Sequence, residues 1–84
     1  MSNVKVYLWT TCPYCLRACS LLDEQGIAYD KIVLDGKDAE LKALRNQTGH
    51  RTVPQIFING EFIGGCSELE ALEASGDLLE MVGS

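Results

Sequence analysis

The sequence places two cysteines three residues apart, Cys12 and Cys15, and a third at Cys19. A thiol attacks a disulfide as its thiolate, and a Cys-X-X-Cys pair at a helix start can alternate between dithiol and disulfide. Close cysteine pairs also occur in structural zinc sites, which commonly take four ligands from two such pairs. Three interpretations therefore have to be separated: redox chemistry, half of a metal site, and plain core packing.

The number of candidate ligands limits the metal interpretation. Beyond Cys12 and Cys15, the chain offers Cys19, Cys66 and His50, and it contains no second Cys-X-X-Cys pair. Cys19 lies four residues after Cys15 on an apolar helix face, so we interpret it as a small buried side chain. The pattern favours a redox pair over a zinc site.

The flanking residues predict that Cys12 lies at the N-terminus of a helix. Val4–Leu8 alternates apolar and polar residues as a strand does, and Pro13 suits the first turn of a following helix. Unpaired backbone N–H groups and the helix dipole stabilise an anion there, which predicts a lowered pKa for the Cys12 thiol. Cys15 lies one turn further on and is more buried, so we expect Cys12 to attack and Cys15 to resolve the mixed disulfide.

The remaining pattern predicts an α/β fold in the order βαβαββα. The first two strands form a βαβ unit, so they should be parallel with a right-handed crossover. Asn59-Gly60 between two apolar runs indicates a two-residue hairpin turn. The expected strands are 4–8, 27–34, 55–58 and 61–64, and the expected helices are 14–24 and 39–47. A Ser67/Glu70 capping box opens a last helical region, which runs through Leu72 and, after Gly76, on to Met81.

Composition restricts the class of protein. The chain has 84 residues, 46% of them apolar, which suits one domain spanning 1–84, and no apolar run approaches the ~20 residues of a membrane span. The net charge is −5 and the sequence shows no Lys/Arg cluster, which argues against nucleic acid as a partner. The N-terminus has no secretory signal pattern, so we expect a cytoplasmic protein.

Two further segments could line a binding groove. Thr52-Val53-Pro54 precedes the third strand, and the sequence does not decide whether the bond before Pro54 is cis or trans. A cis bond would turn the Val53 backbone toward an extended peptide-like substrate. Gly64-Gly65-Cys66-Ser67 precedes the last helix, and its N–H groups could bind a carboxylate or form a plain turn and cap.

Taken together, "CPYC", "TVPQIFI" and "IGGCSEL", in this order and spacing, make the chain resemble a dithiol glutaredoxin of the thioredoxin-like superfamily over essentially its full length. Tyr14 favours this family over thioredoxins, which carry Cys-Gly-Pro-Cys. The resemblance implies a thioredoxin-like fold, with a four-stranded mixed sheet flanked by helices and a cis Pro54. It also implies glutathione-dependent reduction of protein disulfides and glutathione mixed disulfides. A role in electron transport and cell redox homeostasis would follow from this activity.

The resemblance also implies residue roles. Cys12 would be the nucleophile, Cys15 the resolving thiol, and the two would form the redox-active disulfide. The Val53 backbone would pair with the cysteinyl unit of glutathione, and the Cys66 and Ser67 amides would hold its γ-glutamyl carboxylate. The implied glutathione-binding set is Tyr14, Arg51, Thr52, Val53, Pro54, Gly65, Cys66 and Ser67.

The implied partners follow from the same resemblance. Glutathione would act as a co-substrate, with no metal and no tightly bound cofactor. Further partners would be glutathionylated or disulfide-containing proteins, glutathione reductase indirectly through glutathione, and thioredoxin reductase as an alternative electron donor. The protein is expected to be a monomer that binds neither nucleic acid nor a membrane.

One position departs from the family pattern. Many glutaredoxins carry a lysine three residues before the nucleophile, where this chain has Trp9, a side chain suited to core packing or to a wall of the groove. Arg51 is the nearest basic residue to the expected groove by sequence, and a solvated surface charge is its alternative. Less direct candidates for the missing charge are Lys42, Arg45 and Arg17.

Other functions remain open at this stage. A dimeric iron–sulfur carrier would share a cluster through Cys12 and glutathione, but Pro13 stiffens the loop and Cys15 can divert Cys12 into a disulfide. A thioredoxin-like reductase served by a flavoprotein is a close relative of the leading hypothesis. A non-enzymatic zinc module is disfavoured by the ligand count, and the role of Cys66 stays open.

Overall fold

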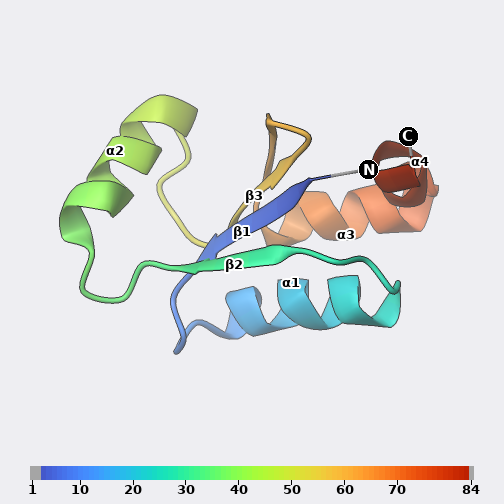
Figure 1. Cartoon of the computed structure of the whole chain (residues 1–84), viewed down its shortest axis with the longest axis horizontal. Helices are drawn as coiled ribbons and strands as arrows, with labels where there is room; N and C mark the ends of the chain where they lie inside the picture. Colours follow the sequence, from blue (N-terminus) through green and yellow to red (C-terminus); the bar gives the residue numbers. More distant parts are fainter. Residues whose placement is uncertain (1–2, 84) are drawn as a thin grey trace.

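A computed structural model describes residues 3–83 of the chain as a four-stranded sheet with helices packed against it (Figure 1). The fold class confirms the sequence prediction. The elements are β1 (Val4–Leu8), α1 (Pro13–Glu24), β2 (Asp30–Val33), α2 (Asp38–Thr48), β3 (Gln55–Ile58), β4 (Glu61–Gly64), α3 (Cys66–Ser75) and α4 (Asp77–Gly83).

The sheet has the order β2-β1-β3-β4, so β1 lies between two partners of opposite direction. It pairs in parallel with β2, with Lys5 opposite Asp30, and antiparallel with β3, with Val6 opposite Ile56. The β3–β4 pair is antiparallel across the Asn59-Gly60 turn, where φ is +53° and +84° as a type I′ turn requires. The predicted mixed sheet and hairpin are therefore confirmed.

The core lies between one face of the sheet and helices α1 and α3. Alternate residues of β1 are buried, and α1 contributes a stripe at helical spacing. The loop between α2 and β3 reaches the end of β1 where α1 begins, far along the chain from it (Figure 1). The buried residues contributed by β1, α1 and α3 are Val4, Val6, Leu8, Cys15, Ala18, Cys19, Leu22, Cys66 and Leu69.

The C-terminal helical region is interrupted at Gly76, as expected, but its start differs from the sequence expectation. Gly76 adopts φ +84°, a left-handed conformation that ends α3, and α4 begins at the next residue. The predicted capping box at Ser67 is wrong, because the helix begins earlier, at Cys66. Glu68 Oε1 accepts a hydrogen bond of 2.6 Å from the Gly65 N–H and caps the helix there.

The second strand also differs from the sequence expectation, whereas the end of the second helix does not. The second strand is shorter than expected, since β2 begins at Asp30 and the turn after α1 takes up the preceding residues. Helix α2 ends where predicted, with Gly49 in the left-handed conformation at φ +74°. No helix within residues 3–83 is long and apolar enough to cross a membrane.

Candidate redox site

Cys12 is the residue that caps α1, directly before Pro13. Its Sγ donates a hydrogen bond of 3.7 Å to the backbone carbonyl of Val53, which precedes Pro54. The Val53–Pro54 peptide bond is cis, as the resemblance implied. The first helix and the loop before β3 therefore meet at the Cys12 sulfur.

Cys15 is fully buried, and its thiol lies close enough to Cys12 for Cys12 to act on its ionisation. Burial raises the pKa of the Cys15 thiol to about 12, because a thiolate loses its hydration there. The backbone of Trp9 opposes this with a hydrogen bond that stabilises the thiolate, whereas the neighbouring Cys12 raises the pKa further. The two thiols thus differ in exposure, Cys12 being partly exposed and Cys15 enclosed.

This raised pKa predicts a loss of stability at alkaline pH. A thiol whose pKa is higher in the folded state stabilises that state below the unfolded pKa of about 8.5, and the contribution disappears as pH rises through the folded value. We expect the free energy of unfolding to fall between about pH 8.5 and about pH 12. Urea unfolding at several pH values measures this fall.

A Cys15→Ala variant is the control for the alkaline effect. Its stability at pH 7 is lower, but its further loss above pH 9 should be smaller than that of the parent chain. Some loss remains, because burial also raises the pKa of the Cys66 thiol and of Tyr29. Identical slopes in the two proteins would show that Cys15 does not carry the effect.

The N-terminus of α3 completes the cluster around Cys12. Burial raises the pKa of the Cys66 thiol, and the Cys12 and Glu70 charges act on it in the same direction. Gly65 lies against the cis peptide, since a Cβ there would be 3.3 Å from the Pro54 carbonyl oxygen. A larger residue at Gly65 would therefore press on the loop that faces Cys12.

The other residues implied by the resemblance lie in more open positions. Tyr14 is 59% exposed on the first turn of α1, and Ser67 is exposed on the first turn of α3. The exposed Thr52 contacts His50, with 3.2 Å between Oγ1 and Nε2. Arg51 lines a hollow beside α2. Cys12 thus lies beside Cys15 and the loop ending at Pro54, whereas Tyr14, Ser67 and Arg51 are exposed at the surface.

Trp9, which replaces the usual family lysine, is half-buried and packs against the core. Its carbonyl accepts a hydrogen bond of 3.3 Å from the Cys12 N–H, so its backbone shapes the turn that leads into the helix. The indole therefore serves packing, and its backbone contacts both thiol residues.

Gln55 is a site residue that the sequence reasoning missed. Its side chain is completely buried, directly after Pro54. Gln55 Oε1 accepts a hydrogen bond of 2.8 Å from the Thr48 hydroxyl, and Nε2 donates one of 2.6 Å to the His50 carbonyl. These bonds fix the loop that presents Val53 to Cys12. The available signal was a single amide in an otherwise apolar strand.

Asp35 is a second residue that was missed. Its carboxylate accepts hydrogen bonds from Thr10, at 3.0 Å from the backbone N–H and 2.5 Å from the hydroxyl. These bonds from Thr10 hold the pKa of Asp35 below its usual value. Asp35, which follows β2, therefore holds the segment that leads from β1 to Cys12. The Asp35-Gly36 turn pair was its sequence signal.

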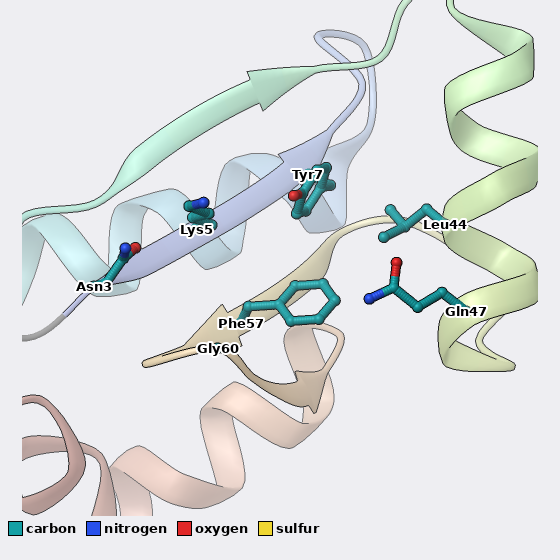
Figure 2. A pocket seen from close by; sticks show the side chains of 7 residues that line it. All are labelled: Asn3, Lys5, Tyr7, Leu44, Gln47, Phe57 and Gly60. Carbon is teal, nitrogen blue, oxygen red and sulfur yellow. The ribbon is translucent and has the colours of Figure 1, made fainter.

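A separate pocket of about 180 Å³ lies on the other face of the sheet (Figure 2). Tyr7 and Phe57 meet there edge to face, with ring centroids 5.6 Å apart, and Leu44 of α2 points toward them. None of the cysteines lines this pocket, so it is distinct from the thiol site. Its lining is Asn3, Lys5, Tyr7, Leu44, Gln47, Phe57 and Gly60.

The zinc interpretation needs clustered ligands. Among residues 3–83, no three histidine, cysteine, aspartate or glutamate side chains are arranged to hold a metal ion.

Comparisons of the sequence and of the structure with known proteins all find relatives of one family. The family model described as glutaredoxin matches residues 4–63. Glutaredoxin 3 of Escherichia coli is 45% identical over 78 residues, covering 93% of this chain and 94% of that protein. A buckwheat glutaredoxin–glutathione complex superposes with a TM-score of 0.94 at 39% identity, covering 98% of this chain and 77% of that one. The dithiolic glutaredoxin 2-C-Grx1 of Trypanosoma brucei brucei gives a TM-score of 0.87 at 41% identity, covering 94% and 84%.

Proposed function

This chain belongs to the glutaredoxin family and is a glutathione-dependent thiol–disulfide oxidoreductase, and from that premise we propose that Cys12 is its nucleophile and Cys15 its resolving thiol. One observation carries the assignment. The partly exposed Cys12 Sγ lies 3.7 Å from the Val53 carbonyl, at the helix start, and the buried Cys15 lies one turn further along the same helix, close to it. An attacking sulfur, a second sulfur within reach and a backbone edge for substrate are thus adjacent.

With a glutathionylated protein, the Cys12 thiolate attacks the glutathione sulfur. The protein–glutathione bond breaks, the protein leaves as a thiolate, and glutathione is joined to Cys12. A second glutathione thiolate then attacks this mixed disulfide, which frees Cys12 and releases oxidised glutathione. Glutathione supplies both electrons, and Cys15 takes no part in this route.

With a protein disulfide, Cys12 first forms a mixed disulfide with one protein sulfur and releases the other as a thiolate. The Cys15 thiolate then attacks Cys12, which frees the second protein sulfur and leaves a Cys12–Cys15 disulfide for two glutathiones to reduce. Forming the mixed disulfide removes the Cys12 thiol that raises the pKa of Cys15. Cys15 is thereby more readily ionised at the step that needs its thiolate.

Glutathione is proposed to bind as a co-substrate along the cis-Pro54 loop, with no further cofactor. The Val53 backbone pairs with its cysteinyl unit, and the Cys66 and Ser67 amides hold its γ-glutamyl carboxylate. The burial of Val53 and Cys66 beside Cys12 supports this placement. The remaining proposed contacts are Tyr14, Arg51, Thr52, Pro54 and Gly65.

The domain organisation, oligomeric state, partners and location are proposed on the same basis. Residues 1–84 act as a single glutaredoxin domain and as a monomer on glutathionylated and disulfide-containing proteins. Glutathione reductase serves it through glutathione, with thioredoxin reductase as an alternative donor. A cytoplasmic location suits a protein whose reductant keeps the thiols of that compartment reduced. The iron–sulfur alternative is less favoured, because the nearby Cys15 can divert Cys12 into a disulfide.

Trapping the intermediate tests these roles. A reduced Cys15→Ser variant, mixed with oxidised glutathione, should accumulate one glutathione on Cys12, which mass spectrometry of the intact protein and its peptides can locate. The parent chain should instead accumulate a Cys12–Cys15 disulfide. Glutathione attached mainly at Cys19 or Cys66 would contradict the assignment of the nucleophile.

A further inference from the structure

A hollow of about 600 Å³ lies between the exposed side of α2 and the loop that leads to the cis-Pro54 bond. Lys42, Arg45 and Asn46 contribute from α2, spaced so that they share one helix face. Gly49 ends the helix, and Arg51 closes the hollow from the loop. We call these five residues the basic hollow.

The basic hollow is positively charged, whereas the chain as a whole is negatively charged. Three of the seven lysines and arginines line it and no acidic residue does, although the net charge is −5. Within residues 3–83 the one ion pair joins Arg17 to Glu70, so the cations of the hollow have no carboxylate partner. Folding therefore gathers cations that are spaced along the chain.

The basic hollow is connected directly to the redox site. Arg45 Nε donates a hydrogen bond of 2.9 Å to the Arg51 carbonyl. Two residues further along, the Val53 carbonyl accepts the hydrogen bond from Cys12 Sγ. Two extended residues span at most about 7 Å, so a segment bound near Arg51 lies close to the attacking sulfur.

We propose that the basic hollow docks an acidic segment of the protein substrate, lying a few residues from the cysteine whose disulfide Cys12 attacks. This deepens the proposed function and rests on it. Unpaired cations around an open hollow complement the carboxylates of an acidic segment. They raise the rate at which such a segment encounters the protein, and they orient it. A short acidic segment meets only this patch, whereas a long polyanion such as nucleic acid would also meet the net negative surface.

The test compares two synthetic peptides that each carry one glutathionylated cysteine. One has glutamates two to four residues from the cysteine, and the other has lysines at those positions. With glutathione as reductant at low ionic strength, kcat/KM should be about tenfold higher for the acidic peptide. Added salt should shrink this preference, because it screens exposed charges.

Two variants of equal charge locate the effect. Lys42→Glu should remove most of the acidic preference. Lys31→Glu, an exposed position on β2 outside the hollow, should retain it. Circular dichroism melts should show both variants folded. An acidic preference unchanged in Lys42→Glu, or lost equally in Lys31→Glu, would overturn the proposal.

A small substrate separates this proposal from the proposed function. The mixed disulfide of glutathione and 2-mercaptoethanol has no flanking peptide, so Lys42→Glu should turn it over within about twofold of the parent rate. An equal slowing of small and peptide substrates would mean that the hollow serves glutathione itself and would overturn the docking role. Failure of the parent chain on the small substrate would instead contradict the oxidoreductase function.

Discussion

Cys12→Ser is expected to lower the turnover of a glutathione mixed disulfide by at least about 1,000-fold, because a serine hydroxyl is not ionised at neutral pH and forms no disulfide. Every step proposed for this site passes through a bond to Cys12 Sγ. The rate is measured as oxidised glutathione formed from a small mixed disulfide, in the presence of excess reduced glutathione.

Cys15→Ser provides the contrast. It should retain most of the activity on glutathione mixed disulfides, because glutathione itself releases Cys12 on that route, and it should lose most of the activity on protein disulfides. Cys19→Ser, on the same helix, is the matched control and should change neither activity greatly. Equal losses from Cys12→Ser and Cys15→Ser on the small substrate would exclude the single-thiol route.

Gln55→Leu is expected to lower the free energy of unfolding by about 2 kcal/mol, although leucine nearly matches glutamine in size. The His50 carbonyl would lose its partner next to a buried side chain, and an unsatisfied buried polar group costs about 1–3 kcal/mol. The Thr48 hydroxyl is spared, because it lies 3.1 Å from the Leu44 carbonyl and can turn to it. In a chain of 84 residues this loss should lower Tm by roughly 10 °C.

Gln47→Leu, an exposed position on α2 at the edge of the separate pocket, is the matched control and should change stability by about 0.5 kcal/mol or less. Gln55→Leu should also raise KM for glutathione more than it lowers kcat, since it loosens the Val53 loop and leaves both thiols in place. A purely structural residue would alter stability without this kinetic change. Unchanged stability in Gln55→Leu would show that the two hydrogen bonds contribute little.

The parts of this protein that could be predicted from sequence are those specified by neighbouring residues. Pro13 after Cys12 marks a helix start, Asn59-Gly60 marks a tight hairpin, and both lie where expected. The role of Gln55 depends on Thr48 and His50, which reach it only once α2 has packed beside β3. Hydrogen bonds of this kind leave little trace in spacing or hydrophobic period.

The same reason explains the basic hollow and the start of the last helix. Lys42 and Arg45 are unremarkable along the chain, and Arg51 joins them only because the loop folds back on α2. At the start of α3, Ser67 and Glu70 fit a capping pattern, but the cap forms two residues earlier, where Glu68 accepts a hydrogen bond from the Gly65 N–H. Two overlapping local signals were present, and the packing of Gly65 against the Pro54 loop accompanies the one that forms.

Because the thiols are buried to different degrees, the rates at which they are alkylated can report local opening of the protein. Cys15 is 0% exposed and Cys19 is 7% exposed, both on the inner face of α1, whereas Cys12 is partly open to solvent. An alkylating reagent should therefore modify Cys12 in the folded state but reach Cys19 only when α1 leaves the sheet. When reclosing is faster than alkylation, the labelling rate of Cys19 reports the fraction of molecules that are open at equilibrium, without denaturant.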